Sequence, residues 1–330
     1  MNRIAMLLLA LACALPAHAG KKYSYDRVGA PDDLAPGGTT HGVVLMGGGT
    51  EVDSSMRNMC EWANGGDFLV IRAAGTDAYN PYLQDICPGL NSVATLVIPS
   101  NSAAADPFVA RTILAAEAIW IAGGAQDDYI NYWTGTPVQV ALNTAISNGV
   151  PIGGTSAGLA VLTQYVYSAL GSKGVTSAQA LENPYNRYVT LASDFVNLPA
   201  LAGIIGDTHF VTRDRMGRAM AFLCRITNEG WGEPRAIAVD EETALEIPAQ
   251  GPAKVASNRS DGGVYFLSPT EPAEYCEPKT PLTFRSVDVH RVGASESFDL
   301  GTWTSSDGIR YRVSAESGVL TSTQDGGSVY

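Results

Sequence analysis

The chain has 330 residues, of which 45% are hydrophobic and 16% are charged, and its formal net charge is −12. This apolar content is typical of a globular protein and excludes a disordered one, and the length can bury one large core or two smaller ones. The acidic balance argues against nucleic acid as a partner, because a DNA- or RNA-binding surface needs clustered Lys and Arg.

Residues 1–19 read as a targeting segment rather than as part of the fold. Arg3 precedes an apolar run over residues 4–15, and the small residues Ala17 and Ala19 match a signal-peptidase site. We therefore predict a signal peptide that ends near Ala19 and a mature protein that is secreted or periplasmic. The apolar run is too short to span a bilayer comfortably, so no membrane anchor is expected.

Cleavage at that site leaves an even number of cysteines, namely Cys60, Cys87, Cys224 and Cys276. An even number in an oxidising compartment indicates disulfides, and four cysteines allow three pairings. We expect Cys60–Cys87 and Cys224–Cys276, with buried free thiols as the alternative.

Wholly apolar segments alternate with helical ones along residues 42–154. Strands of this kind, separated by helices, indicate an α/β fold with a mainly parallel sheet that is covered on both faces. In such folds a ligand binds beyond the carboxyl ends of the strands, and three of these ends carry glycine-rich turns, at residues 47–49, 123–124 and 153–154. The predicted strands are 42–49, 67–75, 93–99, 118–124 and 150–154, and the predicted helices are 56–66, 106–117 and 136–149.

The pattern changes near residue 262, where prolines and alternating segments such as 286–292 and 309–315 predict antiparallel strands. We therefore divide the mature chain into an α/β domain over residues 20–261, which holds the candidate catalytic groups, and a β-rich C-terminal extension over residues 262–330. The extension carries no evident catalytic group.

The sequence GTSAG places Ser156 between a predicted strand and a predicted helix. A G-x-S-x-G sequence at such a junction is typical of a nucleophile elbow, a sharp turn that presents the serine hydroxyl at the sheet edge. The N–H groups that follow Ser156 can stabilise an oxyanion, and small neighbours leave room for the strained turn and for a substrate. The alternative is a glycine-rich turn with an incidental serine.

A nucleophilic serine needs a base, and His209 is the best candidate of the four histidines. His18 leaves with the signal peptide, His41 precedes the first core strand, and His290 lies in an alternating strand of the extension. His209 follows an apolar strand and therefore lies at a strand terminus, as Ser156 does. A packed histidine at the start of a helix is the alternative.

The residue types alone leave open which acid would orient this base. Asp240, Glu241 and Glu242 all lie near the end of a predicted strand, and Asp207 precedes His209 by two residues. Any one of the first three could equally belong to a solvated acidic turn.

The segments GGAQ, GGTSAG, DTHFVTRDRMGR and VDEETAL together resemble the cyanophycinase and aspartyl-dipeptidase family of serine peptidases, peptidase family S51, and are closest to its cyanophycinase branch. The resemblance extends over about residues 42–245. It implies a three-layer α/β/α fold of the class I glutamine-amidotransferase type and a Ser–His–Glu triad that works without a cofactor. No metal is expected, because the mature histidines are far apart in sequence and no H-E-x-x-H motif occurs.

By position, the resemblance makes Ser156 the nucleophile, His209 the base and Glu241 the acid. The backbone groups that it implies near the substrate carbonyl and the oxyanion are those of Gly48, Gly49 and Ala157. The polar positions that it implies around the substrate are Gln126, Asp207, Arg213, Arg215 and Arg218.

The branch of the family implies cyanophycin as the substrate, a polyaspartate with arginine on its β-carboxyls, and β-Asp-Arg dipeptides as products. Arginine recognises carboxylates well, and we expect one or two of the three arginines to reach the site and the rest to be solvated or paired with Asp214. Asp207 or Asp127 could bind a substrate guanidinium. Ala125 and Thr208 depart from the aspartate and glutamine typical of these positions, which puts the specificity in doubt more than the reaction.

Several alternatives stay open at this point. Within the family, the chain could be an aspartyl dipeptidase or an isoaspartyl peptidase. Outside it, an α/β-hydrolase esterase would use His290 as the base, and a non-catalytic binding protein could keep the same fold. A glutamine amidotransferase is disfavoured because its nucleophile is cysteine. The assembly is also open, with a homodimer as one alternative.

Overall fold

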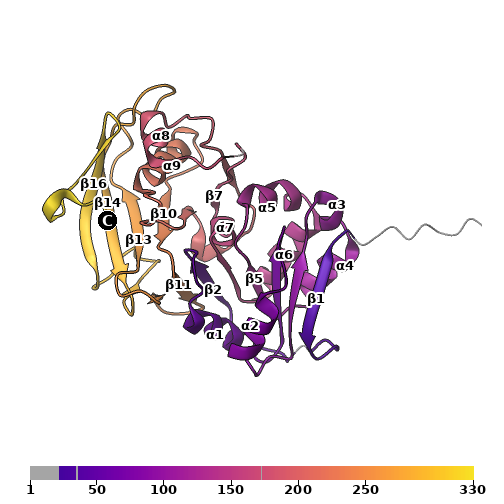
Figure 1. Ribbon diagram of the computed structural model, residues 1–330. Coiled ribbons are helices and arrows are strands. Elements are labelled where there is room, and N and C mark those ends of the chain that lie inside the picture. The colour runs from indigo at the N-terminus through magenta and orange to yellow at the C-terminus, as the bar shows by residue number, and fades with distance from the viewer. Residues whose placement is uncertain (1–21, 35, 172) are drawn as a thin grey trace, which may run out of the picture.

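The computed structural model describes residues 22–34, 36–171 and 173–330, and they form two β-sheets with helices packed against them (Figure 1). The predicted signal peptide over residues 1–19 lies outside the described residues. None of the helices in this described part has the length and apolar character needed to cross a bilayer.

The first sheet has nine strands in the order β1-β4-β3-β5-β6-β2-β11-β12-β15. Only its centre, from β4 to β2, is parallel, whereas β1 and the three strands beyond β2 pair antiparallel, so the sheet is mixed. The predicted parallel strands are those of the centre, where apolar residues fill both faces. The strands are β1 (Ser24–Gly29), β2 (Gly42–Met46), β3 (Asp67–Arg72), β4 (Ser92–Val97), β5 (Ala118–Ile121), β6 (Ile152–Thr155), β11 (Thr243–Pro248), β12 (Ala253–Ser257) and β15 (Ser297–Phe298).

Helices cover both faces of this sheet, which gives the three layers. Alternate residues of β2 point to opposite faces: Val44 and Met46 pack in one cluster with Met56, whereas Val43 and Leu45 belong to another. The first cluster includes α1 (Asp53–Trp62) and α2 (Tyr79–Ile86). The second includes α3 (Asn101–Ala104), α4 (Pro107–Leu114), α5 (Gln126–Trp133), α6 (Pro137–Ser147) and α7 (Ala157–Ala160).

The second sheet has eight strands in the order β17-β16-β14-β13-β10-β9-β7-β8, and Figure 1 shows it beside α8 and α9. One face packs on the end of the first sheet, because Ile237 and Phe266 share a cluster with Leu245. The other face packs on α8 (Ser177–Glu182) and α9 (Met216–Asn228). The strands are β7 (Tyr165–Tyr167), β8 (Leu191–Ser193), β9 (Ile204–Asp207), β10 (Arg235–Val239), β13 (Gly263–Pro269), β14 (Phe284–Gly293), β16 (Ile309–Glu316) and β17 (Val319–Ser322), and two short 3₁₀ turns lie at Pro199–Leu201 and Asp325–Gly327.

The C-terminal residues 262–330 are rich in strands, and the antiparallel strands predicted at 286–292 and 309–315 are confirmed as parts of β14 and β16. They do not form a sheet of their own. Strand β13 pairs antiparallel with β10, so these strands extend the sheet to which β9 and β10 belong.

The described residues contain two disulfides, in the pairing expected from the sequence. Cys60 in α1 is bonded to Cys87 at the end of α2, and Cys224 in α9 is bonded to Cys276 in the loop after β13. All four are at most 9% exposed, so both bonds lie in the packed interior.

Candidate active site

Ser156 lies on a sharp turn between β6 and α7, with the backbone angles φ 51° and ψ −113°. A positive φ is strained for a residue with a side chain, and the turn is held because the Ser156 N–H donates to the Met46 carbonyl at 3.0 Å. The small neighbours are needed for close approach. A Cβ added to Gly158 would lie 1.9 Å from the Ile121 carbonyl oxygen of β5, and one added to Gly154 would lie 2.6 Å from the backbone of Gly158.

His209 faces Ser156 from the second sheet, with 2.7 Å between its Nε2 and the serine Oγ. It follows β9, also has a positive φ of 46°, and donates its backbone N–H to the Gly47 carbonyl at 2.8 Å. The imidazole lies against Gly48, where an added Cβ would be 2.2 Å from the ring. The glycine turn after β2 therefore leaves space for the His209 imidazole, and it also bends the chain.

Glu241 completes a hydrogen-bonded chain, because its Oε1 lies 2.6 Å from Nδ1 of His209. It belongs to the tight turn between β10 and β11, as the sequence indicates. Of the four acids that the sequence leaves open, Glu241 is the one bonded to the imidazole.

The other three acids have different contacts. Asp240 accepts hydrogen bonds from the N–H groups of Val211 and Gly263, and burial raises its pKa to about 6. Glu242 uses its backbone N–H to bind the Gly48 carbonyl at 2.7 Å, which ties the acidic turn to the glycine turn. Asp207 is paired with arginines.

The pKa of His209 is lowered from its ordinary value, chiefly because burial disfavours the imidazolium. The hydrogen bond that His209 Nδ1–H donates to Glu241 raises this pKa and the nearby charges of Arg213 and Arg215 lower it, but burial has the largest effect. The imidazole is therefore neutral at neutral pH, the form that can accept a proton from a serine hydroxyl.

Ala157 follows Ser156 directly, and the turn of Gly48 and Gly49 lies against the His209 ring. The N–H of Ala157 opens α7, where it has no partner within the helix. Gly48 and Gly49 have φ of +105° and +81°, conformations that residues with a side chain rarely adopt. These are the three positions that the sequence predicts to lie near a substrate carbonyl.

The three arginines after His209 differ in their surroundings. Arg218 is buried and binds both carboxylate oxygens of Asp207, and Arg215 lies 3.5 Å from the same carboxylate. These pairs hold α9 to the end of β9, so the contacts of Asp207 and Arg218 are within the fold. Arg213 is half-exposed, with its Nε 3.9 Å from Oε1 of Glu241.

Gln126, which was expected near the substrate, has a contact within the fold. It begins α5, and its side-chain amide donates to the Tyr167 carbonyl at 2.6 Å, so it links α5 to β7.

His290 lies in β14, where its Nε2 is 2.7 Å from the Asp307 carbonyl oxygen and its ring packs on Phe298. The esterase alternative needs His290 beside Ser156, and its contacts are elsewhere.

Sequence reasoning missed Gly47 and Tyr330 as parts of the site. A Cβ at Gly47 would lie 2.0 Å from the Asp240 carbonyl oxygen, so this residue allows the glycine turn and the acidic turn to approach each other. The three successive glycines at 47–49 were a signal for such a contact. Tyr330 bonds to the segment after His209, and no local pattern connects residues so far apart in the chain.

The elbow serine, the imidazole and the carboxylate are joined by two hydrogen bonds, an arrangement typical of serine hydrolases. The family model described as peptidase family S51 matches residues 43–182, which include Ser156 but neither His209 nor Glu241. Over these residues, which make up less than half of the chain, the sequence is similar to peptidase family S51, and this likeness supports a serine-type peptidase. No curated protein matches the sequence.

Solved structures resemble the fold. A peptidase from an acI-B1 Actinobacterium is 16% identical with a TM-score of 0.53, and the alignment covers 80% of this chain and 98% of that one. A candidate Peptidase E from Listeria monocytogenes EGD-e is 14% identical with a TM-score of 0.42, covering 67% of this chain and all of that one. The first likeness supports the α/β architecture and says nothing of the substrate.

Proposed function

We propose that Ser156, His209 and Glu241 form the catalytic triad of this peptidase. The observation that carries the proposal is the unbroken chain of two hydrogen bonds, 2.6 Å from Glu241 to His209 and 2.7 Å from His209 to Ser156. The strained backbone of Ser156 further supports it, because strain of this kind clusters at functional sites.

The reaction begins when the Ser156 Oγ attacks the carbonyl carbon of the scissile amide and His209 Nε2 takes the hydroxyl proton. Glu241 holds the imidazole with its Nδ1–H directed at the carboxylate and stabilises the imidazolium. The N–H groups of Ala157 and Gly48 bind the oxyanion.

Collapse of the tetrahedral intermediate breaks the C–N bond, and His209 gives its proton to the departing amine. Water then attacks the acyl-enzyme, loses its proton to His209 and releases the carboxylic acid, while the serine regains a proton. Every step is proton transfer or acyl transfer, so His209, Glu241 and backbone N–H groups suffice.

We infer that the substrate is cyanophycin and that the products are β-Asp-Arg dipeptides. The motifs shared with the cyanophycinase branch support this, as does the exposed Arg213 beside Glu241, which is placed to receive a substrate carboxylate. The departures at Ala125 and Thr208 concern the specificity rather than the reaction, and the runner-up is an aspartyl dipeptidase or isoaspartyl peptidase with the same triad.

A secreted or periplasmic location fits this substrate class, since a polymer outside the cell must be degraded there. The two disulfides support the proposal, because disulfides persist in oxidising compartments.

The substrate is tested by incubating the purified protein with insoluble cyanophycin and, separately, with α-Asp-X and β-Asp-X dipeptides, and identifying the products by mass spectrometry. Release of β-Asp-Arg from the polymer supports the proposal. Cleavage of the dipeptides alone, with the polymer intact, assigns the runner-up specificity. The Ser156→Ala variant is the control for contaminating peptidases.

A further inference from the structure

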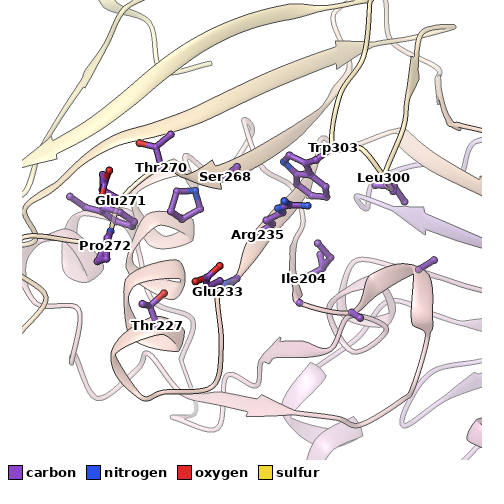
Figure 2. A pocket seen from close by; sticks show the side chains of 16 residues that line it. Ile204, Thr227, Glu233, Arg235, Ser268, Thr270, Glu271, Pro272, Leu300 and Trp303 are labelled. Carbon is purple, nitrogen blue, oxygen red and sulfur yellow. The ribbon is translucent and has the colours of Figure 1, made fainter.

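A cavity of about 400 Å³ opens at the end of the second sheet that lies away from the triad (Figure 2). Its wall is built where β9 and β10 begin, at Ile204 and Arg235, and where β13 ends, at Pro269. Strands β9 and β10 run parallel, and His209 and Glu241 follow their opposite ends. The cavity is therefore separated from His209 and Glu241 by the length of these two strands. Neither of these residues nor Ser156 lines it.

Arg235 presents a stacked cation in this cavity. Its guanidinium carbon lies 4.8 Å from the centre of the Trp303 ring, and Figure 2 shows the two side chains together. Among the ion pairs of the described residues, none includes Arg235. A guanidinium held by an aromatic face keeps its in-plane N–H groups available for a carboxylate.

Two carboxylates line the same cavity. Glu233 and Glu271 are both exposed, and neither takes part in an ion pair with another described residue. They approach from different elements, the segment before β10 and the loop after β13, and Figure 2 shows them on the same side of Arg235. The cavity thus holds one positive and two negative side chains that form no ion pairs with other described residues.

The hydroxyl side chains of Thr227, Ser268 and Thr270 and several apolar side chains supply the rest of the lining. Ile204 and Phe284 are buried beneath it, and Leu300 is partly buried at its side. Ligand sites in proteins commonly combine an apolar surface with a few convergent polar groups, in volumes from about 300 Å³.

We propose that this cavity binds a zwitterion of dipeptide size, with the ligand's carboxylate on Arg235 and its ammonium group on Glu233 or Glu271. A ligand with a single charge would leave one sign of charge in the cavity without a partner, whereas a zwitterion satisfies both. The apolar floor takes an aliphatic side chain. This inference does not depend on the substrate or on the triad, because no catalytic group is involved.

The test is a calorimetric titration of Ser156→Ala protein, which prevents turnover, with L-alanyl-L-leucine. Two matched probes each remove one charge: the N-acetyl derivative lacks the ammonium group, and the C-terminal amide lacks the carboxylate. We expect saturable binding of the free dipeptide below about 10 mM, and at least about tenfold weaker binding of each blocked form.

Variants then assign the binding to this cavity. Arg235→Gln and the double variant Glu233→Gln/Glu271→Gln should each weaken binding at least about tenfold, which corresponds to ~1.4 kcal/mol. Arg57→Gln, at an exposed position of α1, is the matched control and should bind as the parent does. Absence of saturable binding overturns the proposal, and so does binding that the cavity variants leave unchanged. The variant side chains are exposed, and unfolding curves verify that the fold is retained.

Discussion

The phenolic hydroxyl of Tyr330 donates a 2.8 Å hydrogen bond to Oδ1 of Asp214, five residues after His209. The same hydroxyl accepts from the Met216 N–H at 2.9 Å, and the ring packs edge-on against Phe210. The C-terminal segment thus holds the loop that carries the base. This contact gives the strands after residue 262 a link to the site that the sequence did not suggest.

Removing this hydroxyl should impair catalysis more than binding. Tyr330→Phe keeps the ring contacts but frees the loop, and we expect kcat to fall ~5- to 30-fold with little change in KM, because the variant loses two hydrogen bonds that are each worth about 1 kcal/mol. Steady-state kinetics on a dipeptide substrate measure this. The control is Tyr275→Phe, whose side chain is 57% exposed. Equal loss in both variants would show that the effect is not specific to the loop.

Replacing the acid should change both the rate and its pH dependence. Glu241→Gln removes the carboxylate that raises the His209 pKa, so the acidic limb of kcat/KM should move to lower pH, and kcat should fall about 10³- to 10⁴-fold. In the unmodified protein this limb should already lie below pH 6.5, the ordinary histidine value, because burial lowers the pKa of His209. The neighbouring Glu242→Gln is the control, and an identical profile for both variants would remove Glu241 from the triad.

The buried pair of Asp207 and Arg218 should stabilise the fold far more than a surface pair does. Asp207→Asn leaves the buried Arg218 and the partly buried Arg215 without a carboxylate, and we expect the free energy of unfolding to fall by about 3–5 kcal/mol. The matched change Asp261→Asn breaks a pair with Arg259 that is largely exposed, and should lower the free energy of unfolding far less, because water screens such a pair. Urea unfolding compares the two, and similar losses would contradict the account.

Stability should fall as the pH rises toward neutrality, partly through Glu51. Burial raises the pKa of this carboxyl from 4.5 to about 7, so the folded protein holds a proton there that the unfolded chain has released. Protonated Glu51 therefore stabilises the folded protein fully below pH 4.5, and this stabilisation is lost as the pH passes about 7. It amounts to at most ~3 kcal/mol. Glu51→Gln keeps the hydrogen bond with Tyr79 and should flatten the pH dependence of unfolding between these values.

The control for this titration is Glu61→Gln, at an exposed position of the nearby helix α1. It should leave the slope of stability against pH unchanged. If Glu51→Gln also leaves the slope unchanged, then Glu51 is ionised in the folded protein at acidic pH and the burial argument is wrong.

The local parts of the site could be predicted from the sequence. Glycine turns, a G-x-S-x-G junction and apolar segments are short-range patterns, so Ser156, the central strands and helices α1, α4 and α6 were foreseen. The family resemblance was needed to choose Glu241, because Asp240 and Glu242 belong to the same turn and composition does not tell which side chain faces inward.

The long-range parts could not be predicted. The N-terminal strand β1 and the antiparallel edge strands are recognised only by their partners, so the sheet has more strands than the five parallel ones predicted. The contact between Tyr330 and the His209 loop, and the cavity at Arg235, likewise depend on segments that are distant in sequence. Arg215 and Arg218 looked available for a substrate, and only the fold shows that Asp207 takes both.

The central claim is tested most directly by labelling with a fluorophosphonate probe, followed by mass spectrometry of the modified peptide. The account predicts that the unmodified protein is labelled on Ser156, that Ser156→Ala is not labelled, and that His209→Ala is labelled far more slowly while His290→Ala is labelled normally. Labelling that survives Ser156→Ala, or that is lost with His290 rather than with His209, would contradict it.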